Sequence, residues 1–313
     1  MAELTATRDA YGQALAELGG ENPNVVVLDA DLSKSTKTAE FGKKYPDRFF
    51  NIGIAEANMV GMAAGLALTG KIPFVSTFAI FGTGRAYDQV RNAVCYPHLN
   101  VKLALSHAGV TLGEDGASHQ MLEDLALMRA LPNMTVVVPA DATETKQAVR
   151  ALAAMDGPAY LRLGRPPVPV LFGDSYRFQI GKAPKLRDGK DVAILACGVL
   201  VGEAMQAAEQ LEKEGVSALV LNVSTIKPLD EEAVVAAARQ CGCVVTAEEH
   251  NVMGGMGSAV AEALARRLPT PMRFIGTQDT FGESGRPDEL LEKYGLKSHH
   301  IAAAAREVMK LKR

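Results

Sequence analysis

Short apolar segments alternate with segments of helical periodicity along the first half of the chain. Apolar runs of this length are typical of buried strands, and apolar residues at helical spacing are typical of helices that pack on a sheet. Strands are expected at 24–31, 73–79, 101–106, 134–141 and 159–163. Helices are expected at 7–18, 56–68, 85–94, 121–131 and 142–154. This alternation predicts a mostly parallel sheet with helices on both faces.

The pattern breaks at 166–190, a segment rich in Pro, Gly and charged residues, and then resumes. Further strands are expected in DVAILACG, SALVLNVST, CVVTAEEH and MRFIGTQ, with helices at about 201–213, 231–239, 257–267 and from 301. The sequence therefore predicts an α/β protein of two domains, each a mostly parallel sheet flanked by helices. We expect the first domain at 1–165, a linker at 166–190 and the second domain at 191–313. The length of 313 residues fits two cores, because single cores stop growing at about 250–300 residues.

Composition excludes several classes of protein. The net charge of −3, with no basic stripe, argues against a protein that binds nucleic acid or anionic membranes non-specifically. The N-terminus lacks a signal-peptide pattern, and no apolar run is long enough to span a membrane, so a cytoplasmic protein is expected. The four cysteines are expected to be small buried hydrophobic residues, since no second pair of soft ligands would complete a zinc site.

Ligands of open α/β sheets bind beyond the carboxyl ends of the strands, so the loops after the predicted strands are the candidate site. The loop SHAGVTLGEDGASHQ carries His107 and His119 on either side of two acids, together with three glycines. These residue types suit sugar hydroxyls and proton transfer. They suit a metal poorly, because the two histidines are far apart and no cysteine joins them. The loops after the other strands carry Asp31, Ser35, Phe78, Phe81 and Arg165.

Glu56 stands at the start of a predicted helix that is apolar almost all round and therefore buried. Two interpretations are open from these residues alone. An acid in the first turn is favoured by the helix dipole. Alternatively, a desolvated carboxyl group keeps its proton and takes part in chemistry.

Several motifs together resemble the transketolase family: GIAEANMVGMAAGLA, STFAIF, LGEDGASHQMLEDLALMRALPNMTVVVPAD and EEHNVMGGMGSAVAEAL. The similarity runs along the whole chain but corresponds only to the second half of a full-length enzyme, its thiamine-diphosphate pyrimidine-binding domain and its C-terminal domain. The Gly-Asp-Gly motif through which this family binds Mg²⁺ and the diphosphate is absent. The resemblance therefore implies the C-terminal subunit of a split transketolase, with no metal ligand of its own. Its partner would be an N-terminal subunit that supplies the Mg²⁺ ligands, with two copies of each chain.

The resemblance also implies roles for the candidate residues in binding the cofactor. Glu56 would hydrogen-bond the aminopyrimidine ring of thiamine diphosphate as a neutral acid. Phe78 and Phe81 would pack around that ring, and Asp31 would be an acid on the cofactor side. Two positions depart from the family pattern, because Gly84 replaces a frequent aromatic residue and Ala57 replaces a frequent histidine.

For the substrate, the resemblance implies that His107 and His119 line the sugar channel as catalytic residues and that Asp115 binds a substrate hydroxyl. Arg8, Ser35 and Arg165 would hold the sugar phosphate at the channel mouth, where the planar guanidinium groups can bind phosphate oxygens in pairs.

The implied reaction is transfer of a two-carbon ketol unit from a ketose phosphate to an aldose phosphate, as in the pentose phosphate pathway. Three alternatives remain open: the beta subunit of a 2-oxoacid dehydrogenase decarboxylase, an enzyme like deoxyxylulose-phosphate synthase, and a non-catalytic paralogue. His107 with LGEDG favours a sugar enzyme over the first. The joint presence of Glu56, His107, Asp115 and His119 argues against the last.

Overall fold

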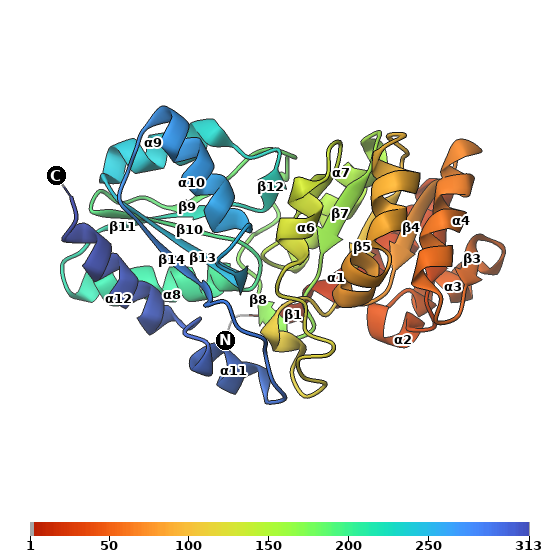
Figure 1. Ribbon diagram of the computed structural model, residues 1–313, viewed down its shortest axis with the longest axis horizontal. Helices are drawn as coiled ribbons and strands as arrows, with labels where there is room; N and C mark the ends of the chain where they lie inside the picture. The colour runs from red at the N-terminus through yellow and green to blue at the C-terminus, as the bar shows by residue number, and fades with distance from the viewer. Residues whose placement is uncertain (1–2, 313) are drawn as a thin grey trace.

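Two α/β lobes lie side by side in the structure, a computed structural model that describes residues 3–312. Figure 1 shows one lobe built mainly from the red-to-green first half of the chain and the other from the cyan-to-blue second half. Each lobe contains a sheet with helices packed against it, as the sequence predicts. All four cysteines are buried and free, as expected. Among the residues described, no helix has both the length and the apolar character needed to cross a membrane.

The first lobe is built on a seven-stranded sheet in the order β12-β6-β7-β5-β4-β2-β3. Six of these strands come from the first half of the chain and pair in parallel. They are β2 (Val25–Asp29), β3 (Phe49–Asn51), β4 (Ile72–Ser76), β5 (Lys102–Leu105), β6 (Thr135–Val137) and β7 (Ala159–Arg162). The central strands are buried along their whole length, which explains their continuous apolar sequences.

Helices cover both faces of this sheet. The α-helices are α1 (Thr7–Glu21), α2 (Ser33–Thr36), α3 (Ala39–Lys44), α4 (Glu56–Leu68), α5 (Tyr87–Gln89), α6 (Asp124–Ala130) and α7 (Ala142–Ala154). Shorter 3₁₀ turns are η1 (Pro46–Arg48) and η4 (Val110–Leu112), and π-helical segments are η2 (Ile80–Arg85) and η3 (Val90–Cys95).

Two predicted helices differ from the structure. The helix expected at 85–94 is present, but it consists of the end of η2, α5 and η3 rather than a single α-helix. Gly82 lets η2 lie close to β5, since a Cβ there would lie 2.4 Å from a methyl group of Leu105. The helix expected at 121–131 begins only at Asp124. The carbonyl groups of Met121 and Leu122 accept hydrogen bonds from other segments, so these two residues stay outside the helix.

The second lobe contains a five-stranded sheet in the order β14-β13-β10-β11-β9. The parallel strands are β10 (Val192–Ala196), β11 (Ala218–Asn222), β13 (Val244–Asn251) and β14 (Met272–Thr277). An antiparallel edge strand, β9 (Lys185–Arg187), pairs with β11. The helices are α8 (Leu200–Lys213), α9 (Glu231–Cys241), α10 (Met256–Arg267), α11 (Pro287–Lys293) and α12 (Ser298–Met309).

The segment 166–190 is more ordered than a free linker. It contains β9 and also β8 (Pro167–Pro169), which pairs antiparallel with β1 (Leu4–Ala6). Proline is tolerated in such edge strands, so the proline content that suggested a linker does not exclude them. In addition, β12 (Thr225–Lys227) from the second half pairs with β6 in the first sheet. The boundaries 1–165 and 191–313 stay a prediction, and the chain crosses between the lobes more than once.

Buried polar groups also join the two lobes. The Arg162 Nε atom donates to Asp124 Oδ2 at 2.6 Å, and another Arg162 nitrogen donates to the backbone oxygen of Glu249 at 2.9 Å. Burial by itself would raise the pKa of Asp124, but the charge and hydrogen bonds of Arg162, together with His250 and Tyr160, hold that pKa below its usual value. An ion pair at the end of β7 is thus tied to β13 of the second lobe, which fixes the loops after both strands.

Candidate active site

The predicted site residues follow strands that are neighbours in the first sheet. The strands β7, β5, β4 and β2 lie side by side and run in parallel, so the loops at their carboxyl ends share one edge of the sheet. These loops carry Asp31, Ser35, Phe78, Phe81, His107, Asp115, His119 and Arg165. Arg8 reaches the same edge from the first turn of α1, as its contacts with Ser35 and His107 show.

Glu56 is the first residue of α4, and only 1% of its side chain is exposed. Glu56 lies on the buried side of this helix, but the predicted burial of the whole helix is wrong for this chain, because Met62 and Leu68 on its other side are exposed. An Arg85 nitrogen donates to Glu56 Oε2 at 3.0 Å, and the Arg85 guanidinium also lies over the ring of Phe81, 4.4 Å from its centroid. The Arg85 side chain is 51% exposed, so a half-solvated cation compensates the buried carboxylate. A ligand group that hydrogen-bonds Glu56 Oε2 therefore has to replace Arg85.

Phe78 is the centre of an aromatic cluster formed by two of these loops. Its ring stacks on that of His107 with centroids 3.9 Å apart, and it lies nearly parallel to Phe81 at 5.9 Å. The His119 ring meets Phe81 edge-on at 5.5 Å. Four residues chosen from the sequence as site candidates are thus packed together.

His107 has a defined tautomer and stays neutral. Arg8 donates to His107 Nε2 at 3.0 Å, so Nε2 is the acceptor and the proton lies on Nδ1, which donates to Ser106 Oγ at 2.7 Å. Burial lowers the pKa of His107 to about 3, and the charges of Arg8, Arg165 and Lys37 add to this effect. At neutral pH His107 is therefore an uncharged imidazole held in place from both sides.

A groove of about 530 Å³ is lined in part by Arg8, which contacts His107, and other cations lie on its wall. Arg8, Lys37 and Arg165 line it together with Asp9. Arg8 donates to the backbone oxygen of Ser35 at 3.1 Å, so Ser35 contributes its carbonyl group here. Arg165 donates to the backbone oxygen of Leu112 and, at 2.6 Å, to Glu114 Oε2. The predicted phosphate-binding arginines therefore lie in one groove.

Two candidates are less integrated into the site. Asp31 is exposed in a left-handed conformation (φ 64°), and its Oδ1 accepts a hydrogen bond from Asn51 at 2.9 Å. The turn after β2 is held instead by Asp29, whose carboxylate accepts from the Leu32 backbone and from two threonine hydroxyls. Asp115 is also exposed, and among residues 3–312 its side chain has no hydrogen bond or ion pair to the histidines.

Sequence reasoning did not identify Glu249 as part of this region. Its carboxylate Oε1 accepts a hydrogen bond from the Thr111 backbone at 2.6 Å, within the histidine loop. Gly109 provides the room, because a Cβ at that position would lie 2.2 Å from the Glu249 carboxyl carbon. Burial raises the pKa of Glu249 to about 7, against the opposing charge of Arg162. The available signal was a pair of acids at the end of the apolar run CVVTAEEH.

Comparison with known proteins decides the family. The model of the transketolase pyrimidine-binding domain matches residues 3–170, and that of the transketolase C-terminal domain matches residues 181–301. The chain belongs to the transketolase family. The resemblance found in the sequence is confirmed, and with it the two-domain α/β fold.

Relatives of similar length support the assignment to the second half of a transketolase. A putative transketolase C-terminal section of Methanocaldococcus jannaschii is 50% identical over 97% of this chain and 96% of its own length. A 6-deoxy-6-sulfo-D-fructose transketolase subunit of a Clostridium species is 46% identical over 97% of this chain and 95% of its own length. A solved structure described as a split gene transketolase, inactive beta4 tetramer, is 56% identical with a TM-score of 0.93, over 98% of this chain and 99% of its own.

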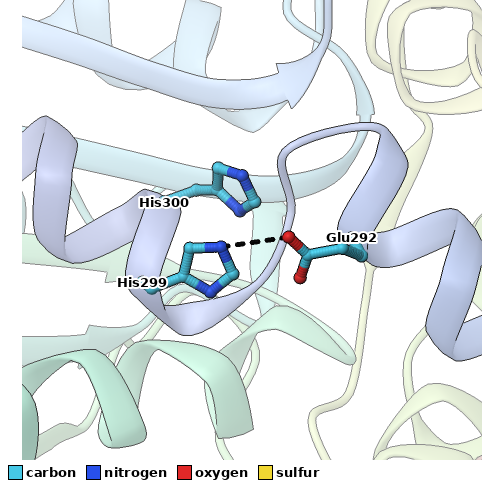
Figure 2. A group of neighbouring side chains, drawn as sticks. All are labelled: Glu292, His299 and His300. Atoms are coloured by element: carbon cyan, nitrogen blue, oxygen red, sulfur yellow. Dashed lines mark ion pairs between the residues drawn. The ribbon is translucent and has the colours of Figure 1, made fainter.

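The residues of this chain fit the pyrimidine half of thiamine diphosphate, the cofactor that the family implies. A buried carboxyl group and two phenylalanine rings offer a hydrogen-bonding group beside apolar surfaces, which is what an aminopyrimidine requires. They do not offer a site for the divalent metal. In the part of the chain that the structure describes, one group of possible ligands is found, Glu292, His299 and His300 (Figure 2).

This group belongs to the surface of the second lobe, where α11 and α12 meet. His299 Nε2 lies 3.1 Å from Glu292 Oε1, and the two imidazole rings lie 4.0 Å apart. One carboxylate and two imidazoles do not suit Mg²⁺, which prefers oxygen ligands in octahedral geometry. The expectation that the metal ligands lie on a partner subunit stays a prediction.

Proposed function

We propose that this chain is the pyrimidine-binding half of a two-chain transketolase that transfers a two-carbon ketol unit between sugar phosphates. The observation that carries the proposal is the arrangement at one sheet edge. Arg85 joins the buried carboxyl group of Glu56 to the ring of Phe81, the two phenylalanines pack with two histidines, and Arg8 joins His107 to a groove lined by cations. A cofactor ring, a sugar and a terminal phosphate each find complementary chemistry there.

Thiamine diphosphate, when bound, supplies the nucleophile for a ketose carbonyl. Glu56 holds a proton next to the aminopyrimidine ring in this proposal. Its position in a nearly solvent-free pocket supports this role, because desolvation favours the neutral acid. Arg85 occupies Glu56 Oε2 as long as their ion pair persists. Loading of the site therefore includes displacement of Arg85 from Glu56 and from the face of Phe81.

The two histidines have different tasks. His107 is buried and neutral and supports the ring of Phe78, and it contacts the sugar through Nε2 when the sugar replaces Arg8 there. His119 is less buried and has its Nδ1 within 3.0 Å of Ser118 Oγ, so its position suits proton transfer with a substrate hydroxyl. Asp115, Asp31 and Ser35 complete the proposed contacts with substrate and cofactor.

The partner is a subunit with the Gly-Asp-Gly motif and the Mg²⁺ ligands, most simply in an assembly with two copies of each chain. Two facts support this. The sequence lacks the motif, and the homologous beta chain described as a tetramer is also described as inactive. We assign sugar phosphates as substrates because three cations line the groove. The Clostridium relative, named for a sulfonated sugar, defines the competing substrate class.

The test is a ketol-transfer assay on the chain purified with the Gly-Asp-Gly-bearing subunit encoded in the same genome, using xylulose 5-phosphate and ribose 5-phosphate. The wild-type complex should release glyceraldehyde 3-phosphate. The Glu56→Gln complex should lose about 10²-fold or more in kcat, the usual scale for removal of an acid–base group. Glu209→Gln, which changes an exposed glutamate of α8 outside the site, is the matched control and should keep wild-type turnover. An inactive wild-type complex, or a Glu56→Gln complex with near-normal turnover, would refute the proposal.

A further inference from the structure

We propose that Lys37 is a third cation of the substrate groove and binds the terminal phosphate of the sugar together with Arg8 and Arg165. This inference rests on the proposed function and makes it more specific. Neither the motifs of the sequence nor the family resemblance singled out Lys37.

Lys37 is fixed at the wall of the groove by its backbone. It follows the last residue of α2 and has the left-handed conformation (φ 69°), which is uncommon for a residue other than glycine. Gly12 of α1 makes room for this turn, because a Cβ at position 12 would lie 2.5 Å from Lys37 Cβ and 2.6 Å from its carbonyl oxygen. The flanking residues Thr36 and Thr38 both donate hydroxyl hydrogen bonds to buried Asp29.

The Lys37 ammonium group is the least committed of the three cations. Arg8 is held by Ser35 and His107, and Arg165 by Leu112 and Glu114. Lys37 Nζ lies 3.0 Å from Asp9 Oδ1. The two side chains are 37% and 39% exposed, so this pair is weak and its partners can exchange.

A phosphate in the groove provides a better partner for Lys37 than Asp9 does. The groove contains Arg8, Lys37 and Arg165, against the acids Asp9 and Glu40. Glu40 is exposed and already pairs with Lys43 at 3.0 Å. A terminal phosphate dianion therefore meets a positive wall, and the flexible lysine stem lets the ammonium group turn from Asp9 to the phosphate oxygens. The charge of Lys37 is felt at His107, which places it within electrostatic reach of the proposed sugar channel.

The experiment compares Lys37→Gln, Lys37→Arg and Lys34→Gln in the two-chain complex. Lys34 is exposed on the same short helix and lies outside the groove, so it is the matched control. Kinetics are measured with xylulose 5-phosphate and ribose 5-phosphate, and with the unphosphorylated pair hydroxypyruvate and glycolaldehyde. Inhibition by inorganic phosphate is measured at saturating cofactor.

We expect Lys37→Gln to raise the KM of the phosphorylated substrates and the inhibition constant of phosphate about three- to tenfold, the scale of a partly exposed charged contact. The unphosphorylated pair should be unaffected. Lys37→Arg and Lys34→Gln should remain within twofold of wild type. Asp9→Asn should act in the opposite direction and lower the KM for phosphorylated substrates, because it releases Lys37 and removes a negative charge.

The inference is overturned if Lys37→Gln matches Lys34→Gln, or if it affects both kinds of substrate equally. Fructose 6-phosphate and 6-deoxy-6-sulfofructose are also compared as donors. If Lys37→Gln raises the KM of the sulfonated sugar more than that of the phosphorylated one, the assignment to a phosphate is overturned. Each of these three results would leave the proposed function intact if the wild-type complex transfers ketol units. Absence of transfer in the wild-type complex would instead refute the proposed function.

Discussion

Replacing Arg165 by alanine should impair phosphorylated substrates much more than hydroxypyruvate. Arg165 lines the groove beside Arg8 and Lys37, and its side chain is 34% exposed. A hydrogen bond to a charged group contributes about 1.5–3 kcal/mol, and partial exposure places this contact near the lower end. A loss of about 1.5–2 kcal/mol corresponds to about a 10- to 30-fold fall in kcat/KM for a phosphorylated substrate.

The same substitution also has an effect that does not depend on phosphate. Arg165 holds Leu112 and Glu114, so its removal loosens the histidine loop and affects every substrate. The Glu114→Gln variant separates the two effects, because it breaks the ion pair but keeps the guanidinium group. Glu114 is exposed, and such pairs contribute about 0–1 kcal/mol, so this variant should lose at most about fivefold for either kind of substrate.

The assay measures kcat/KM of the two-chain complex with xylulose 5-phosphate and with hydroxypyruvate as donors. An unphosphorylated acceptor, glycolaldehyde, is used throughout, so the donor phosphate is the only one present. The Arg165→Ala variant should change the ratio of the two values at least fivefold, and Glu114→Gln should leave it unchanged. Equal losses for both donors in Arg165→Ala would show that Arg165 only supports the loop, and the phosphate role would be wrong.

Two further predictions concern buried ionisable groups. His107 should stay neutral from pH 8 to pH 5 as the Nδ1–H tautomer, because burial and three cations lower its pKa to about 3. Nitrogen-15 NMR of labelled histidine checks this, and a titration midpoint near 6.5 would contradict it. The folded chain should lose stability as the pH rises from about 4.5 to about 7, because folding raises the pKa of Glu249 to about 7 and so opposes its ionisation. Glu249→Gln should therefore be more stable than wild type by about 1–3 kcal/mol at pH 8 but not at pH 4.5, whereas a pH-independent difference in thermal unfolding would refute this.

The sequence predicts the parallel strands well because burial on both faces leaves a continuous apolar run. The sequence does not predict the elements whose formation depends on tertiary contacts. The pairing of β12 with β6 joins segments that are far apart in the chain, and no local pattern encodes it. The edge strands β8 and β9 have three residues each, and the prolines of β8 and the charged residues of β9 do not distinguish them from a linker. The late start of α6 depends on hydrogen bonds accepted from other segments.

In the candidate site, too, the sequence predicts local features and misses those that depend on tertiary contacts. The burial of Glu56 was predictable only in part, because its helix is apolar almost all round but only the side that carries Glu56 is buried in this chain. Its ion pair with Arg85 was not, since the partner comes from a separate π-helical segment. In the turn after β2, two aspartates with similar local sequence take different positions. Asp29 caps the turn and Asp31 faces solvent, and only the structure separates them.

The central claim is that this chain contributes the pyrimidine side of a cofactor site that a second chain completes. Calorimetric titration of thiamine diphosphate with Mg²⁺ tests it most directly, on the purified chain alone and on the chain mixed with the Gly-Asp-Gly-bearing subunit. The account predicts no tight Mg²⁺-dependent binding to the chain alone and saturable, Mg²⁺-dependent binding to the mixture. Tight Mg²⁺-dependent binding to the chain alone would contradict it, because the metal and diphosphate site would then have to lie within this chain.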